Sequence, residues 1–300
     1  MSKTKAWIGA MRLRTLPLSL SGIILGSSVA YFNGYFNVTS FVLAIVTTVL
    51  FQVLSNFAND LGDSSKGTDN DNRIGPTRAI QSGVISSKEM KMAVILTSIL
   101  SLISAIGLIY NASQTLSTST IWFYVGLTLA CIAAAIMYTV GKSAYGYHGL
   151  GDLMVFIFFG GVSILGVYSL YAPVFLSENI LLVFFVGLMS VAVLNLNNMR
   201  DYSNDKESGK NTIVVQMGPN LAKFYHIILI LIALMSLALF IEKTEEPLLF
   251  FALTPAIFLF IHLRKVLGVK ELKDFDPELK KVALLTFFIS LLTSIGLFYL

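Results

Sequence analysis

Long apolar segments separated by short polar ones dominate the hydrophobic pattern of this chain. Each apolar segment approaches the roughly 20 residues that a helix needs to cross the hydrocarbon core of a bilayer. Such segments predict a polytopic membrane protein that is all-α, because helices satisfy their own backbone hydrogen bonds in lipid. The nine predicted spans are 15–33, 38–58, 91–110, 120–139, 151–172, 180–198, 220–241, 247–263 and 282–300.

The lysines and arginines are distributed unevenly between the two ends of these spans. When the N-terminus is placed inside, 20 of the 21 basic residues fall in inner segments, and only Lys243 falls outside. Because inner loops of membrane proteins are enriched in Lys and Arg, this asymmetry predicts an inner N-terminus and an outer C-terminus. The inner loops also carry the acidic clusters, whereas the outer loops are short, so we expect function on the inner face.

Composition supports a membrane protein and argues against other classes. Apolar residues make up 55% of the chain and charged residues only 13%, whereas about a quarter of the residues of a soluble domain are charged. The net charge of +4 does not indicate a nucleic-acid partner, because the basic residues lie in short loops rather than on one continuous face. A single cysteine, Cys131, excludes an intrachain disulfide. The sequence predicts one membrane domain over residues 1–300.

A polar, acidic stripe lies at the end of the second predicted span. Four residues spaced i, i+3, i+4 and i+7 form it: Asn56, Asn59, Asp60 and Asp63. This spacing places all four on one face of a helix. Carboxylates gathered on one face repel each other unless a cation lies between them. The stripe therefore favours a cation site, and the alternative is a solvated acidic loop.

A second stripe follows the sixth predicted span, where Asn197, Asp201 and Asp205 are spaced i, i+4 and i+8. An alignment that matches Asp60 with Asp201 also matches Asn56 with Asn197. This internal similarity suggests two helical halves, each of which presents an acidic helix end to a shared cavity. The polar residues also continue back into the apolar span, where they are costly and usually functional.

The two stripes together favour a divalent metal ion that holds a phosphorylated ligand. Mg²⁺ prefers oxygen ligands and is often bound through one or two carboxylates and the phosphates of a substrate. The residues themselves indicate Asn59, Asp63, Asp201 and Asp205 as ligands. Asp69 and Asp71 stay open as further ligands because they lie further from the helix end. No histidine pair has zinc-site spacing, and no Walker A or dinucleotide-binding glycine motif is present.

Basic residues near the stripes are candidates for binding a diphosphate, because Arg and Lys are the usual partners of its charged outer oxygens. The candidates are Arg14, Arg73, Arg78, Lys142 and Arg200. Lys142 is the only basic residue of its inner loop, which also contains Tyr138, Tyr145 and Tyr147. The alternative for each basic residue is a role in setting the membrane topology alone.

The motifs resemble those of the UbiA-type intramembrane prenyltransferases over essentially the whole chain. The first family motif, Asn-Asp-x-x-Asp, is matched by Asn59, Asp60 and Asp63, and the second, Asp-x-x-x-Asp, by Asp201 and Asp205. The chain is most similar to the menaquinone-synthesis branch of this family. The segments that carry this closer resemblance are 12–17, 56–60, 67–69, 145–152, 198–201 and 209–212. Two small departures are the single Gly141 before Lys142 and the Asp152 where the branch often has Glu.

The resemblance implies nine helices around a central cavity that opens at the cytoplasmic side of a bacterial inner membrane. It implies Mg²⁺-dependent transfer of a polyprenyl group from a polyprenyl diphosphate to an aromatic acceptor, 1,4-dihydroxy-2-naphthoate in the most similar branch. The implied metal ligands are Asn59, Asp60, Asp63, Asp201 and Asp205. The residues implied in catalysis are Asp63, Lys142, Asp201 and Asp205. The residues implied in substrate binding are Arg14, Asn56, Arg73, Arg78, Tyr138, Lys142, Tyr145, Tyr147, Asn198 and Arg200.

Two other functions are compatible with parts of this pattern. An enzyme with a different acceptor, such as 4-hydroxybenzoate, would keep the same motifs, because a few pocket contacts decide which acceptor is used. An ion-coupled transporter would also contain polar residues in its spans, but it needs them near the bilayer midplane and in broken helices. Here the polar residues gather at the inner edge of mostly unbroken spans, which favours the prenyltransferase.

Overall fold

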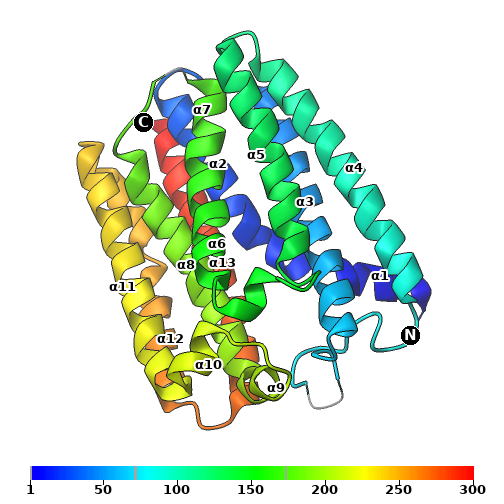
Figure 1. Cartoon of the computed structure of the whole chain (residues 1–300). Helices are drawn as coiled ribbons and strands as arrows, with labels where there is room; N and C mark the ends of the chain where they lie inside the picture. The colour runs from blue at the N-terminus through cyan, green and yellow to red at the C-terminus, as the bar shows by residue number, and fades with distance from the viewer. Residues whose placement is uncertain (1, 71–72, 173) are drawn as a thin grey trace.

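The computed structural model describes residues 2–70, 73–172 and 174–300, and all regular structure in these ranges is helical. Nine helical segments within them are long and apolar enough to cross a bilayer. The long helices stand side by side in a bundle, and the two chain termini lie at opposite ends of it (Figure 1). The predicted all-helical fold with nine spans is confirmed for the described part of the chain.

The spans begin and end within a few residues of the predicted positions, except that the first and the ninth begin earlier and the second ends later. In chain order they are α1 and α2 (Lys3–Met11, Leu16–Phe32), α3 (Val38–Ser65), α4 (Ser87–Ala112), α5 (Thr118–Met137), α6, η3 and α7 (Gly151–Val155, Phe156–Gly166, Val167–Tyr171), α8 (Asn179–Arg200), α11 (Pro219–Lys243), η4 and α12 (Pro247–Leu253, Ala256–Gly268), and η5 and α13 (Leu272–Asp274, Phe275–Tyr299). The remaining short helices are η1 (Leu13–Thr15), η2 (Tyr145–His148), α9 (Tyr202–Glu207) and α10 (Ile213–Met217).

Side-chain caps define where several spans begin. The backbone N–H of Ser40 donates to Asn37 Oδ1 at the start of α3, over 2.9 Å. At the start of α4, Ser86 and Glu89 form a reciprocal capping box. Each cap provides a partner for an N–H group that the first helical turn leaves unpaired.

The helix α8 forms the centre of the bundle and is the most buried of the spans. It packs against α11, η3 and α13. Small residues allow close approach to η3: a Cβ added at Gly160 would lie 2.7 Å from Val183 O and 3.0 Å from Gly187 Cα. Close packing at small residues is the usual way in which membrane helices associate.

Many large apolar side chains point away from the bundle, as expected for lipid contact. Trp122 is 69% exposed and Phe123 is 63% exposed on α5, while Ile103 on α4 is 61% exposed. A soluble protein rarely exposes apolar surface of this extent. These outward faces agree with the long apolar helices in identifying a multi-pass membrane protein.

Two spans are less regular than the sequence predicts. The segment η3 is a π-helix, and the eighth span opens with the 3₁₀-helix η4. Gly160 has no Cβ, which lets η3 stay closely packed on α8 despite its wider winding. Pro247 at the start of η4 cannot donate a backbone hydrogen bond and fits a helix start.

The polar ends of α3 and α8 lie at the same end of the bundle, together with α9, α10 and the N-terminus (Figure 1). The helix α3 continues to Ser65, so the first acidic stripe remains helical, as predicted. The helix α8 ends at Arg200, and α9 follows directly after Asp201. The fold therefore places both acidic stripes where the connecting loops can reach them.

We expect Gly160→Ala to destabilise the bundle by about 1–3 kcal/mol, because the added methyl would force η3 away from α8. Gly161→Ala is the matched control, since a Cβ there has nothing within 4 Å. Thermal unfolding in detergent should show a lower midpoint for Gly160→Ala than for Gly161→Ala. Equal midpoints would mean that the contact between η3 and α8 is not close-packed.

Candidate active site

The first acidic stripe forms the buried inner face of the last turns of α3. Asn56, Asp60 and Asp63 are 3%, 1% and 6% exposed, and Asn59 is half-buried beside them. Thr139, which follows α5, donates to Ala58 O over 3.0 Å and lies over Gly62, where a Cβ would be 2.4 Å from its Oγ1. The absence of a side chain at Gly62 thus lets the 138–147 loop reach this face of α3.

Two arginines from different loops neutralise Asp60. Arg12 donates to Asp60 Oδ1, and Arg78 Nε lies 3.7 Å from the same oxygen. Arg12 adopts a left-handed backbone conformation with φ of 50° after α1, which turns the chain towards α3. Arg14, the predicted substrate-binding residue of this segment, is exposed and forms no ion pair with the acidic residues that the structure describes. Arg12 is therefore a site residue that the sequence pattern did not identify.

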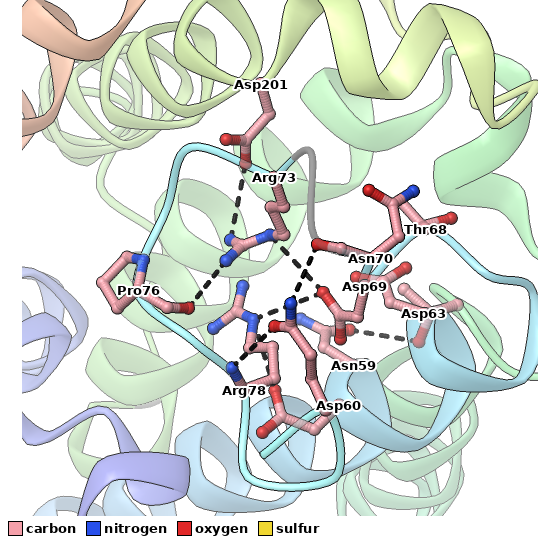
Figure 2. Close-up of polar contacts among 12 residues, drawn as sticks. Asn59, Asp60, Asp63, Thr68, Asp69, Asn70, Arg73, Pro76, Arg78 and Asp201 are labelled. Carbon is pink, nitrogen blue, oxygen red and sulfur yellow. Dashed lines mark hydrogen bonds and ion pairs between the residues drawn. The ribbon is translucent and has the colours of Figure 1, made fainter.

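The loop between α3 and α4 bridges the two acidic stripes. Arg73 lies between Asp69, whose Oδ1 is 3.4 Å from Arg73 Nε, and Asp201, whose Oδ2 is 3.5 Å from Arg73 Nη2 (Figure 2). Arg73 also donates to Pro76 O over 2.8 Å. A Cβ at Gly75 would lie 2.7 Å from Arg73 Nη2, so a side chain there would displace this guanidinium group. The loop therefore joins α3 to the end of α8 through the ion pairs of Arg73.

Arg200 holds Asp201 in a bidentate pair. Its Nε donates to Asp201 Oδ1 over 2.8 Å, and its Nη2 donates to Asp201 Oδ2 over 2.7 Å. Its Nη1 donates to Asp276 Oδ1 of α13 over 2.5 Å. Arg200 is 1% exposed and orients Asp201 in this structure. Its role in substrate binding stays a prediction.

Asp63 contacts residues from two other segments. Tyr147 donates its hydroxyl to Asp63 Oδ1 over 2.8 Å, and Lys210 Nζ lies 3.6 Å from the same oxygen. The Tyr147 hydroxyl also lies 2.6 Å from Thr68 Oγ1. Lys210 is largely buried, whereas Lys142 is exposed and has no ion-pair partner within the described chain. The structure thus places Lys210, rather than Lys142, next to the first motif.

Burial changes the acid–base properties of several groups outside the spans. It raises the pKa of Asp205 to about 7 and that of Asp69 to about 6, because the nearby cations only partly offset the loss of water. Burial alone would also raise the pKa of Asp201, but Arg200 holds it below its usual range. Burial lowers the pKa of Arg78 to about 10. Asp69 and Asp205 are therefore carboxylates of this cluster that another cation would stabilise.

The donor set fits a magnesium ion that is shared with a diphosphate. No group of three Asp, Glu, His or Cys side chains within the described residues could hold a metal ion. Mg²⁺ shared with phosphates needs only one or two carboxylates, with water completing its shell. Buried oxygens without a hydrogen-bond partner are present at Asp60 Oδ2, at both carboxylate oxygens of Asp69 and at Asn204 Oδ1. Asp71 lies outside the described residues.

A cavity of about 340 Å³ adjoins the acidic end of α3. Asn56 and Asn59 line its polar part. Tyr138 and Tyr145, from the loop after α5, also line the cavity. The two tyrosine rings meet edge to face with centroids 5.3 Å apart. Burial raises the pKa of Tyr138 to about 12, so this hydroxyl stays protonated at neutral pH. Most of the other lining residues are apolar.

Some residues that the sequence analysis singled out lie apart from this cluster. Asn198 on α8 is buried, and it has no hydrogen bond to an acidic side chain within the described residues. Asp152 accepts a hydrogen bond of 2.9 Å from Tyr225 of α11, and His148 is exposed. Asn204 of α9, which was not predicted, donates to Thr68 O over 2.8 Å and ties the second motif to the loop after α3.

Solved structures share this fold. A structure described as digeranylgeranylglyceryl phosphate synthase gives a TM-score of 0.62 and 18% identity, with 100% of both chains covered. A UbiA homolog from Archaeoglobus fulgidus bound to DMAPP and Mg²⁺ gives a TM-score of 0.57 and 18% identity, covering 96% of this chain and 99% of that chain. At this level of identity, the similarities show the fold alone.

Curated relatives are much closer in sequence. The chain is 44% identical over 243 residues to the 1,4-dihydroxy-2-naphthoate octaprenyltransferase of Escherichia coli, covering 80% of this chain and 77% of that protein. It is 40% identical over 298 residues to the protein of the same name in Haemophilus influenzae, covering 98% of this chain and 96% of that protein. The UbiA prenyltransferase family pattern matches residues 19–297. The chain therefore belongs to the UbiA prenyltransferase family.

Proposed function

We propose that this protein transfers a polyprenyl group from a polyprenyl diphosphate to 1,4-dihydroxy-2-naphthoate, with loss of CO₂ and diphosphate. The product is demethylmenaquinol, and the pathway is menaquinone biosynthesis. The curated relatives from Escherichia coli and Haemophilus influenzae are named for this prenyl transfer, and this chain matches them over most of its length. The observation that carries the proposal is an acidic, arginine-rich site that directly adjoins an apolar cavity.

A polyprenyl diphosphate has two chemically different parts, and the site offers a matching environment for each. The diphosphate requires cations and hydrogen-bond donors, which are concentrated around the ends of α3 and α8. The prenyl chain requires an apolar passage, which the cavity supplies next to Asn56 and Asn59. The reacting carbon joins the two parts, so it would lie where the polar and apolar walls meet.

The family's Mg²⁺ would be held by Asn59, Asp60, Asp63, Asp201 and Asp205. When bound, Mg²⁺ neutralises charge on the diphosphate and makes it a better leaving group. The buried oxygens of Asp60 and Asp69 that accept no hydrogen bond support a cation at this position. The solved Archaeoglobus fulgidus homolog binds DMAPP and Mg²⁺, which supports the use of Mg²⁺ with a prenyl diphosphate here.

The basic residues of the site would bind the outer oxygens of the diphosphate. Arg73 and Arg78 already lie between the carboxylates and would turn their free N–H groups towards the ligand. Lys210 would add charge beside Asp63, while Lys142 and Arg14 would approach from the exposed loops. Tyr147, Arg200 and Asn198 would position these groups rather than react. Together they would stabilise the negative charge that develops as the diphosphate leaves.

The cavity would protect the allylic cation that remains on the prenyl chain. Its apolar lining limits access of water, which would otherwise consume the cation. The electron-rich ring of the acceptor, held near Asn56, Tyr138 and Tyr145, supplies the electron pair for the new carbon–carbon bond. As CO₂ leaves, the electron pair of its bond to the ring returns to the ring and restores aromaticity.

The proposed site faces the cytoplasm of a bacterial cell, in its inner membrane, and the whole of residues 1–300 acts as one membrane domain. The uneven distribution of basic residues supports this orientation, since all but Lys243 fall in segments on the same side as the acidic motifs. A cytoplasmic site would have direct access to Mg²⁺ and to a water-soluble aromatic acid. The lipid-soluble donor would enter from the bilayer.

Purified protein in nanodiscs should prenylate 1,4-dihydroxy-2-naphthoate, but not 4-hydroxybenzoate, when a polyprenyl diphosphate and Mg²⁺ are supplied. Product would be measured by mass spectrometry. EDTA should abolish the product, and Asp63→Asn should lower turnover by roughly 100-fold because it weakens charge stabilisation at the leaving group. Glu207→Gln, an exposed residue at the same end of the molecule, is the matched control and should behave as wild type.

Two outcomes would contradict this proposal in different ways. Product from 4-hydroxybenzoate alone would keep the fold and the chemistry but replace the acceptor. Folded protein that releases no diphosphate with either acceptor would remove the prenyltransferase function itself and favour the ion-coupled transporter.

Lys210→Met should lower kcat/KM at least about tenfold more than Lys142→Met, because only Lys210 is buried against Asp63. Steady-state kinetics with varied donor concentration would measure kcat/KM for both variants. Thermal midpoints should accompany the kinetics, since Lys210→Met also removes a buried partner of Asp63. A larger loss in Lys142→Met would show that the exposed loop, and not Lys210, supplies the cation for the diphosphate.

A further inference from the structure

A polar group lies in the cavity beyond the residues of the first motif. Gln52 on α3 and Ser19 on α2 both line the cavity. Ser19 Oγ donates to Gln52 Oε1 over 2.7 Å, and Gln52 Nε2 donates to Thr15 Oγ1 over 3.1 Å. A glutamine amide has two N–H donors and two acceptor lone pairs. The orientation of this amide is therefore fixed, and one donor and one acceptor position remain for a ligand.

The surroundings of Gln52 restrict what this ligand can be. Within the described chain, the residues that line the cavity include no Lys, Arg, Asp or Glu. The part of the cavity lining that η3 contributes contains Phe158, Phe159 and Val162. A polar group inside a span is costly unless it has a partner, so an amide in a cavity with this apolar lining points to a function. The ligand part that reaches Gln52 must be flat or apolar, uncharged, and able to form hydrogen bonds.

The prenyl donor does not meet this description. Its chain is a hydrocarbon beyond the diphosphate, and the diphosphate belongs with the cations at the end of α3. Gln52 lies seven residues before Asn59, about 10 Å along the helix axis at 1.5 Å per residue. The amide of Gln52 is thus too far from the motif to share the diphosphate.

The aromatic acceptor does meet this description of the ligand at Gln52. Gln52 and Asn56 are one turn apart on α3, about 6 Å along the axis, which is similar to the separation of two para oxygens across one aromatic ring. Asn56 Nδ2 donates to Met11 O over 2.9 Å, which directs its Oδ1 away from α1. Two amides at this spacing can hydrogen-bond both hydroxyls of a 1,4-diol, while the phenylalanines cover the ring.

We propose that Gln52, oriented by Ser19 and Thr15, binds the 4-hydroxyl of 1,4-dihydroxy-2-naphthoate and so places the ring for attack. This inference rests on the proposed function. The acceptor carboxylate lies on the side of the molecule opposite the 4-hydroxyl, and it stays towards Arg12, Arg78 and Lys210, because the cavity itself offers no cation. Gln52 is therefore a determinant of acceptor specificity.

A purely structural role for Gln52 predicts different behaviour. Its bond to Thr15 also joins α3 to the segment between α1 and α2. If that were its only role, loss of the amide would lower stability and would affect all substrates alike. Kinetic constants for the two substrates, measured separately, distinguish these cases.

The first test compares Gln52→Leu with Thr48→Val, a cavity-lining control one turn away on α3. The Thr48 side chain makes no hydrogen bond to any residue that the structure describes. Gln52→Leu should raise the KM for the acceptor about tenfold, the effect of losing one well-placed hydrogen bond, and should leave the KM for the donor within about twofold. Thr48→Val should change neither constant. A rise in the donor KM, or no change in the acceptor KM of an active Gln52→Leu protein, would overturn the proposal.

The second test uses equilibrium binding without donor, so that no reaction occurs. Wild-type protein should bind 1-hydroxy-2-naphthoate, which lacks the 4-hydroxyl, about tenfold more weakly than the dihydroxy compound. Gln52→Leu should bind the two compounds equally, because the partner of the 4-hydroxyl is gone. A tenfold difference that persists in the variant would assign the 4-hydroxyl to another residue and overturn the proposal.

Folding and the proposed function are controlled separately. If Gln52→Leu does not fold, as judged by size-exclusion chromatography and thermal unfolding, Ser19→Ala replaces it and should reduce the tenfold difference to about threefold. An unchanged difference in folded Ser19→Ala would then count against the proposal. Wild-type protein that prenylates neither the naphthoate nor 4-hydroxybenzoate would refute the proposed function instead.

Discussion

Charge compensation between the ends of α3 and α8 is the interaction on which the rest of the site depends. Buried carboxylates are stable only when cations accompany them. Here Arg73 spans Asp69 and Asp201, and Arg78 lies 3.7 Å from both Asp60 and Asp69. Because these arginines come from the loop after α3, the loop becomes the element that holds the two helix ends in one site.

This arrangement also prepares the site for an exchange of partners. A diphosphate that arrives with Mg²⁺ would bring both signs of charge, so the arginines can turn to the phosphates while the carboxylates turn to the metal ion. The raised pKa values of Asp69 and Asp205 indicate that the cations present only partly offset the cost of burying these two carboxylates. On the proposed function, binding of the donor would therefore complete the charge balance rather than disturb it.

Sequence reasoning located the spans and the acidic stripes, because both depend on local periodicity. It could not choose between neighbouring basic residues. Arg12 rather than Arg14 reaches Asp60, which depends on the left-handed conformation at Arg12. Lys210 rather than Lys142 lies beside Asp63, although both lie far from Asp63 in the sequence. These choices depend on how the loops fold over the helix ends, and hydrophobic periodicity carries no information about that.

The cavity shows a second limit of the hydrophobic pattern. Lipid and a prenyl chain are equally apolar, so an apolar residue such as Phe158, which lines the cavity, looks the same in sequence as Trp122, which is exposed on α5. Polar residues within a span break this ambiguity, since they are costly against lipid and so mark the inward face. Gln52, Asn56 and Asn59 follow one face of α3 from the cavity to the metal motif. The side of α3 that faces the cavity can therefore be recognised in the sequence from polar residues such as these.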